Sequence, residues 1–153
     1  MKFSLSWLKE YLETDNNLDE ILHWLTMVGL EVEKVEDQAQ LVKDFVIGHI
    51  VDAKPHPDAD RLKVLKVQTG TETLEVVCGA PNARADMKGI FACNGSYIPG
   101  LDVTLKTTKI RGITSNGMML SEHEINLSDD HEGIIEVPSK LETGSSAAEA
   151  LGL

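Results

Sequence analysis

The sequence predicts a mainly β protein with small α additions, and three observations support this. Short β-like runs separated by turn residues and glycines fill the chain between Phe45 and Val137. The first 35 residues instead show apolar side chains at helical spacing. A length of 153 residues with 42% hydrophobic content suits one domain, or a small domain with an appendage. The short strands indicate a small antiparallel barrel or sandwich, and their pattern alone favours neither.

The N-terminal segment predicts two short helices. In the first, Ser4 or Ser6 is the expected N-cap, and the apolar positions are Phe3, Trp7, Leu8, Tyr11 and Leu12. Asn17 and Glu20 have the spacing of a capping box, so the second helix should begin after Asn17. Gly29 stands where a left-handed residue ends a helix. The second helix carries the apolar stripe of this segment, which consists of Leu18, Ile21, Leu22, Leu25 and Val28.

This composition predicts a helical segment over residues 1–38 and a β domain over residues 39–150. Val32 and Val35 have the alternation of a brief strand between the two. About 35 residues with one apolar stripe are too few to fold alone, so we expect residues 1–36 to pack on chain beyond Leu153. Ser146 and Glu149 predict a capping box that opens a helix, and the sequence ends four residues after Glu149. We therefore expect the chain to be a piece excised from a longer protein.

The β domain is expected to contain six strands joined by turns. Residues 69–72 read as a hairpin turn between the second and third strands, and Pro55-His56-Pro57 should close the first. The predicted strands are Val46–Val51, Leu62–Val67, Leu74–Cys78, Ile90–Cys93, Val103–Leu105 and Ile134–Val137.

The net charge of −11 is unevenly spread along the chain. Residues 46–120 hold nine basic and seven acidic side chains, whereas the segments before and after them are strongly acidic. The middle segment is thus cationic inside an anionic chain, and a pI near 4.8 misrepresents it.

No apolar run reaches the roughly 18 residues of a membrane-spanning helix. Two cysteines make no disulfide framework, so a cytoplasmic protein is expected.

The local sequence predicts no catalytic residue and no metal site. His56, Asp58 and Asp60 could gather a divalent cation, but they lack a second ligand cluster and are better explained as turn formers. Cys78 lies in an apolar run and is expected to be a small buried side chain. No histidine is spaced to act as the base for a serine or cysteine, and no phosphate-cradling glycine motif occurs.

Basic residues of the middle segment are the candidates for phosphate binding. One group surrounds the Pro55–Pro57 turn, and Lys106, Lys109 and Arg111 form a second within six residues. Scattered lysines on a sheet exterior are common, so this pattern alone leaves phosphate binding open. Aromatic residues are sparse, which favours contacts to the nucleic-acid backbone over base stacking.

Four ordered motifs resemble the tRNA-binding OB-fold family. They are His56-Pro57-Asp58-Ala59-Asp60-Arg61-Leu62, Val77-Cys78-Gly79-Ala80-Pro81-Asn82, the run from Ile110 to Glu122, and Gly133-Ile134-Ile135-Glu136-Val137-Pro138. The runs Phe3–Tyr11 and Leu25–Glu33 are similar to the N-terminal start of the beta-subunit family of bacterial phenylalanyl-tRNA synthetases. The resemblance thus covers essentially the whole chain. The sequence departs from the family pattern at Asp86, where glycine is usual, at Asn94, where proline is usual, and at Glu124-Ile125-Asn126-Leu127.

The resemblance implies an OB-fold, a five-stranded antiparallel barrel, preceded by a short helical segment. It implies a parent aminoacyl-tRNA ligase of two alpha and two beta chains that uses ATP and magnesium. Its active site on the alpha subunit and its proofreading site would lie outside these residues, so no cofactor is expected here. The expected partners are tRNA, the rest of the beta subunit and the alpha subunit, with no membrane and no DNA. Expected tRNA contacts are Arg61, Lys63, Arg84, Lys106, Lys109 and Arg111, with hydrogen bonds from Ser115, Asn116 and Ser121.

Two other hypotheses remain open on the sequence. The first is a structural scaffold that braces the synthetase, in which the cationic turns pair with acidic neighbours. The second is a free-standing tRNA-binding or chaperone-like protein, which the beta-subunit-like N-terminus disfavours. Asn82 and Glu122 match family positions and could serve loop architecture rather than RNA contact.

Overall fold

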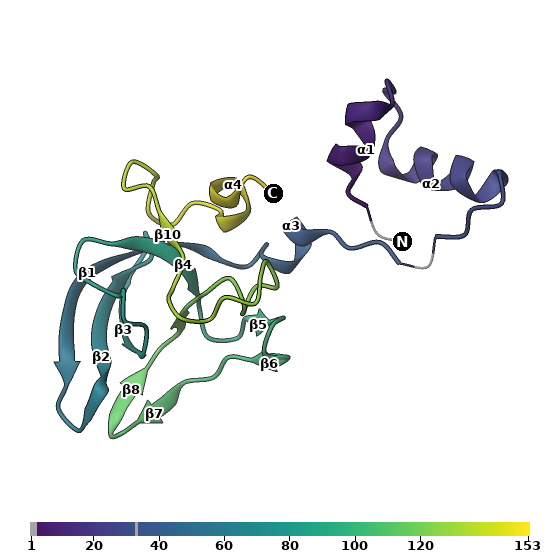
Figure 1. Cartoon of the computed structure of the whole chain (residues 1–153). Coiled ribbons are helices and arrows are strands. Elements are labelled where there is room, and N and C mark those ends of the chain that lie inside the picture. The colour runs from purple at the N-terminus through teal and green to yellow at the C-terminus, as the bar shows by residue number, and fades with distance from the viewer. Residues whose placement is uncertain (1–2, 33) are drawn as a thin grey trace. The chain divides into compact units, whose positions relative to one another are not determined.

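The computed structural model describes residues 3–32 and 34–153, and these divide into two compact units with a boundary between Glu36 and Asp37. The predicted class of a mainly β protein with small helical additions is confirmed (Figure 1).

The N-terminal unit contains helices α1 (Leu5–Tyr11) and α2 (Leu18–Met27). Ser4 caps α1 by accepting a hydrogen bond from the amide of Trp7, and the predicted Asn17–Glu20 capping box forms at α2. Gly29 has φ +90°, the left-handed conformation expected at the end of α2. The brief strand expected around Val32 and Val35 does not form at the described positions there, and Glu33 lies outside the described residues. Local capping signals therefore located both helices.

Little apolar surface is buried within the N-terminal unit. Ile21, at 7% exposure, is the one buried hydrophobic residue among those described there. Large apolar side chains that stay exposed are Phe3, Trp7, Tyr11, Leu12, Trp24, Met27, Val28, Leu30, Val32 and Val35. Packing of this unit on further chain stays a prediction.

Hydrogen exchange should show the N-terminal unit opening far more readily than the β domain. Helices this short are marginal without tertiary packing, so we expect protection of α2 amides on the order of a hundredfold or more below that of the central strands. The measurement is native-state amide exchange followed by NMR on the 153-residue chain. Equal protection in the two units would contradict the expectation.

The main sheet of the β domain is antiparallel, with strand order β10-β4-β1-β2-β3 and β9 paired to β4. Its strands are β1 (Val46–His56), β2 (Ala59–Gln68), β3 (Thr73–Cys78), β4 (Lys88–Ala92), β9 (Met118–Met119) and β10 (Glu136–Val137). Two small hairpins accompany it, β5 (Tyr97–Ile98) with β6 (Val103–Thr104) and β7 (Thr108–Ile110) with β8 (Ile113–Ser115).

The strand pairing of the described residues does not close the expected five-stranded barrel. Instead, the free edge of β3 meets the end of β8 and the residue after it through isolated hydrogen bonds. The amide of Val77 donates to Ser115 Oγ at 3.1 Å, and the amide of Asn116 donates to the Glu75 carbonyl at 2.9 Å. This arrangement is compatible with an OB fold that is joined at this seam by side-chain and single backbone contacts.

Two expectations about local structure were wrong. Strand β1 continues through Pro55 to His56, because it pairs with β2 as a long ribbon carrying a bulge at Val51. Helix α4 (Ala147–Leu151) does begin after Ser146, but the Ser146 side chain makes no capping hydrogen bond. Ser146 is already bridged to Val46, and the amide of Ala147 bonds to the carbonyl of Phe45, so pairing with β1 fixes this start. Helix α3 (Gln38–Leu41), capped by Asp37, was not predicted.

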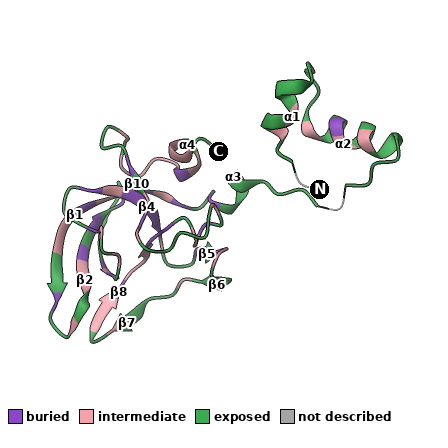
Figure 2. Ribbon diagram, viewed as in Figure 1, coloured by how far each residue is buried: buried purple, intermediate pink, exposed green. Residues whose placement is uncertain are grey.

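Two buried apolar clusters lie on the main sheet (Figure 2). One contains Phe45, Ile47, Ile90 and Leu120, and the other contains Ile50, Leu65, Val67 and Phe91.

Asp86, at a position where the family usually has glycine, adopts a left-handed φ of +65°. Aspartate tolerates that conformation better than most residues, so the loop before β4 keeps its shape.

Candidate nucleic-acid interface

The β1–β2 hairpin ends in a two-residue turn of Pro57 and Asp58. His56 and Ala59 are the last paired residues, and Arg61 follows on β2 with an exposed side chain. The amide of Asp58 donates to Nδ1 of His56 at 3.0 Å. The turn is therefore organised by the histidine ring as well as by proline.

The β7–β8 hairpin presents Arg111 at its tip. Ile110 and Ile113 close a two-residue turn in which Arg111 has φ +51° and Gly112 has φ +87°. Positive φ at both central residues characterises a type I′ turn, which favours asparagine followed by glycine. Arginine at the first position costs about 1 kcal/mol of backbone strain. A strained residue that carries a long cationic side chain points to a role for that side chain.

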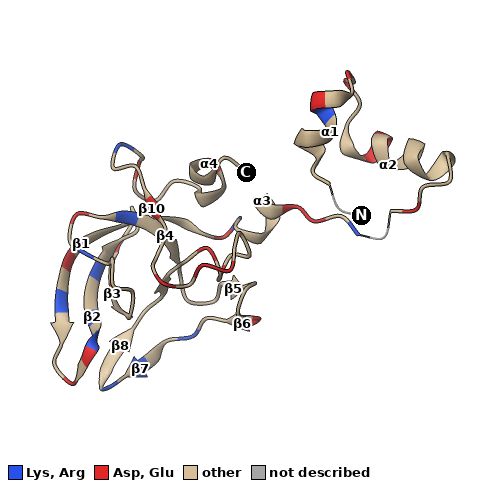
Figure 3. Cartoon of the chain, viewed as in Figure 1, with Lys and Arg blue, Asp and Glu red and all other residues tan. Residues whose placement is uncertain are grey.

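One hydrogen bond joins the tips of these two hairpins. Nδ1 of His56 accepts from Asp58, so the ring proton belongs on Nε2, which lies 3.0 Å from the Ile110 carbonyl and donates to it. His56 is only 5% exposed. Cationic residues distant in sequence thereby come to one end of the β domain (Figure 3).

The six predicted cations divide into two groups by their partners. Across the described ranges 3–32 and 34–153, no acidic or hydrogen-bonding partner is found for the side chains of Arg61, Lys106, Lys109 and Arg111, and all four are exposed. Lys63 instead donates to the carbonyls of Ala83 at 2.7 Å and Pro81 at 3.4 Å. The four free cations are therefore available to phosphates, while Lys63 also holds the 81–83 loop.

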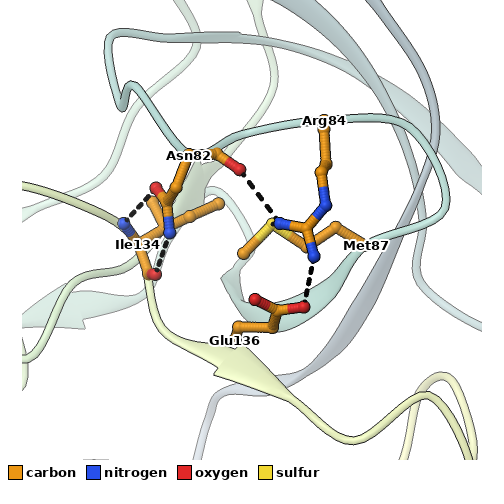
Figure 4. A network of polar contacts seen from close by, with 5 residues as sticks. All are labelled: Asn82, Arg84, Met87, Ile134 and Glu136. Atoms are coloured by element: carbon orange, nitrogen blue, oxygen red, sulfur yellow. Dashed lines mark hydrogen bonds and ion pairs between the residues drawn. The ribbon is translucent and has the colours of Figure 1, made fainter.

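Arg84 belongs to a network that ties the second motif to the fourth (Figure 4). Its guanidinium lies 2.5 Å from the carboxylate of Glu136 and contacts Sδ of Met87. Asn82 accepts from the amide of Ile134 at 3.0 Å and donates to the carbonyl of the same residue at 2.8 Å. A Cβ on Gly133 would lie 2.8 Å from Oδ1 of Asn82, so glycine allows this close approach. Asn82 thus has an architectural role in this structure.

A shallow groove of about 390 Å³ lies between this network and the β1–β2 ribbon. Its charged lining residues are Lys54, Asp60, Arg61, Lys63 and Arg84. Lys54 lies 3.4 Å from Asp52, Arg84 is paired with Glu136, and Lys63 donates only to backbone carbonyls. Among the described residues, Arg61 is the lining cation for which neither an acidic nor a carbonyl partner is found. The groove is positively charged overall and adjoins the hairpin tips.

The three polar residues expected from the third motif have internal partners. Ser115 is buried, accepts from Val77 and donates to the Gly117 carbonyl. Ser121 is buried, and both its amide and its hydroxyl bond to the Glu124 carboxylate. Asn116 is half-buried and donates to the carbonyl of Glu75. In this conformation Ser115 and Asn116 hold the seam beside β3, and Ser121 holds the turn that leads to Glu124.

The structure gives no support to a metal site at His56. Both ring nitrogens have protein partners, and the described portion of the chain holds no cluster of three or more metal-ligating side chains.

Burial raises the pKa of the Cys78 thiol, and burial followed by the charge of Glu72 raises the pKa of Cys93. The hydrogen bond to Asp102 raises the pKa of the Tyr97 hydroxyl. Raised thiol pKa values keep both cysteines protonated, and so weakly nucleophilic, at neutral pH.

Among the described helices, none has the length and apolar content needed to cross a bilayer.

Sequence reasoning missed the link between the hairpins and the partner of Asn82, whose architectural role it had offered beside RNA contact. The signals were present, because His56 precedes the turn by one residue and Asn82 and Gly133 both lie in recognised motifs. Neither signal indicated the bonding partner, because Ile110 lies 54 residues after His56 and Ile134 lies 52 residues after Asn82.

Arg61 lies on β2, Lys109 and Arg111 lie on the β7–β8 hairpin, and Lys106 lies two residues before β7. An antiparallel β domain whose free cations lie on or beside two joined hairpins defines a nucleic-acid-binding β module. Residues 45–146 match the family described as "Putative tRNA binding domain". The chain belongs to this family.

The chain is also similar to beta subunits of bacterial phenylalanine–tRNA ligases, as the motifs indicated. It is 57% identical over 150 residues to that of Mesorhizobium japonicum, covering 97% of this chain and 19% of the relative. The protein of Brucella abortus is 54% identical over 154 residues and is likewise covered to 19%. The chain thus spans about a fifth of the length of these relatives. A solved structure, the MetRS-related protein from Pyrococcus horikoshii, matches with a TM-score of 0.54 and 24% identity over 74% of this chain and 98% of that one, which shows likeness of fold.

Proposed function

We propose that this chain is the tRNA-binding module of a phenylalanine–tRNA ligase beta subunit and assists the joining of phenylalanine to its tRNA. The observation that carries the proposal is the group of free cations on and beside the two joined hairpins, in a chain of the tRNA-binding family. The similarity to ligase beta subunits supports the identity of the parent protein.

The proposed mode of binding is contact with the phosphate backbone. Arg61, Lys106, Lys109 and Arg111 supply the charge, and Lys63 and Arg84 shape the adjoining groove. Of the aromatic residues in the β domain (residues 37–153), Phe45 and Phe91 are buried and Tyr97 alone is exposed, so the surface of this domain offers no row of rings for base stacking. Such contacts recognise the shape and charge of an RNA rather than its bases.

The chemistry of the parent enzyme is placed outside these 153 residues. In this proposal the alpha subunit and the rest of the beta subunit are the protein partners. ATP and magnesium are used by the larger assembly and not by this chain. The chain itself binds and orients tRNA in the cytoplasm and carries no catalytic residue.

Replacing Lys106, Lys109 and Arg111 together by alanine should weaken tRNA binding and flatten its salt dependence. Three or four phosphate contacts imply a slope of log K against log salt of about −2 to −3, at roughly −0.7 for each phosphate on single-stranded nucleic acid. Loss of three cations should bring that slope to about −1 or closer to zero. The measurement is a fluorescence titration of a phenylalanine tRNA transcript at several salt concentrations.

A charge-matched control replaces Lys9, Lys43 and Lys140 by alanine, because these three lie outside the hairpin tips. It changes net charge equally and should shift affinity only slightly. If the hairpin variant binds tRNA like the parent, the scaffold hypothesis takes the place of RNA contact.

A further inference from the structure

Hairpin β7–β8 is held to the main sheet at two separate places. In the described residues it forms its own two-stranded sheet, with no ladder to β1–β4. At its base, Ser115 and Asn116 bond to β3. At its tip, the Ile110 carbonyl accepts the hydrogen bond from His56. The position of the tip that carries Arg111 therefore depends on this histidine.

The histidine connects two turns at once. Through Nδ1 it organises the Pro57–Asp58 turn, and through Nε2 it reaches the residue directly before Arg111. Arg61 lies three residues beyond Asp58 on β2. Arg61 and Arg111 repel each other, although the exposed carboxylates of Asp58 and Asp60 at the β1–β2 tip offset part of that repulsion. The bond from His56 fixes the spacing of the two tips. Contacts held at one spacing bind a polyanion at a higher effective concentration than contacts on independent arms.

We propose that His56 is the positioning residue that holds the tip of β7–β8 to the tip of β1–β2, so that Arg111 and Arg61 bind tRNA phosphates as one surface. The inference rests on the proposed tRNA contact and assigns a role that is separate from it. His56 touches no phosphate itself; it acts through Ile110 on Arg111, and through Asp58 on the turn before Arg61.

Two substitutions separate the two bonds of the ring. His56→Asn places an acceptor at the position of Nδ1, so it keeps the bond from Asp58 and is too short to reach Ile110. His56→Gln places its terminal NH₂ as far from the backbone as Nε2, so it keeps the reach to Ile110. Both remove the ring, so a loss caused only by lost packing should be alike in the two variants.

Titrations with the phenylalanine tRNA transcript provide the test, using the whole 153-residue chain. We expect His56→Asn to bind about three- to tenfold more weakly with a flatter salt slope, and His56→Gln, which loses only the bond from Asp58, to lose less than about threefold. Arg111→Asn should weaken binding in the parent, because it removes the cation while asparagine suits the left-handed turn. It should add little to His56→Asn, because in that variant Arg111 is already out of position. NMR relaxation of the Gly112 amide in the free chain should show a lower order parameter in His56→Asn than in His56→Gln.

The outcomes distinguish this inference from the proposed function. If Arg111→Asn weakens binding while His56→Asn keeps the parent affinity and slope, His56 does not position the tips. The inference is equally overturned if both His56 variants lose affinity to the same extent, or if the effects of His56→Asn and Arg111→Asn simply add. If Arg111→Asn and the triple alanine variant both bind like the parent, the tRNA contact itself is misplaced and the inference falls with it.

Discussion

Replacing Gly117 by alanine is expected to lower the free energy of unfolding by about 3 kcal/mol or more, from overpacking and backbone strain together. Gly117 has φ +142°, a conformation that side chains rarely adopt. A Cβ there would lie 2.3 Å from Cζ of Phe91 and 2.7 Å from the carbonyl oxygen of Ala92. Neither neighbour can yield easily, because the ring is fully buried and the oxygen belongs to a central strand.

Gly112→Ala provides the matched control. Gly112 also has a positive φ, of +87°, but a Cβ there would meet no atom within 4 Å. Its cost should be strain alone, about 1 kcal/mol. Urea denaturation followed by circular dichroism measures both variants. Equal losses at the two positions would show that the predicted clash with Phe91 is relieved by local movement.

Truncation of Phe91 to alanine is expected to cost about 3–5 kcal/mol, the range for large aromatic residues in a packed core. Phe91 is 0% exposed and lies in the cluster with Ile50, Leu65 and Val67. The ring fits because Gly48 and Gly117 both lack a side chain where it packs: a Cβ on Gly48 would lie 2.8 Å from Cβ of Phe91. The loss would be measured as a lower urea midpoint with an unchanged denaturant slope.

Tyr97→Ala is the control for aromatic truncation in the same domain. Tyr97 is half exposed, so its removal should change stability by no more than about 1 kcal/mol. A loss at Tyr97 that matched the loss at Phe91 would contradict the burial on which this prediction depends.

Local signals in the sequence were enough to place the N-terminal helices and most long strands. Ser4, Asn17 and Gly29 each act on backbone groups within four residues, so their meaning does not depend on the rest of the fold. Strands β1, β2 and β3 were found because alternation and turn residues are also local. Strands β5 to β9 were mostly missed, since two or three residues carry no readable period and pair only where the fold brings partners close.

The candidate site was predictable in kind but not in arrangement. Residue type and clustering indicated which cations could meet phosphate. The sequence did not show that Lys63 and Arg84 have internal partners, nor that Ser115 and Ser121 are buried. Each of these outcomes depends on a residue distant in the chain or on the packing around it.

By itself, the sequence determined the fold class, the ends of the two N-terminal helices, the turn between β2 and β3, and the excess of positive charge in the middle segment. These properties depend on side-chain size, charge and backbone preference over a few neighbouring residues. The tertiary structure alone decided which cations stay free and which two hairpin tips are joined. Those features depend on single hydrogen bonds such as His56 to Ile110 and Asn82 to Ile134, whose partners meet only after the sheet has formed. A hydrogen bond needs its two atoms within about 3 Å, and no local pattern encodes that distance between residues more than fifty positions apart.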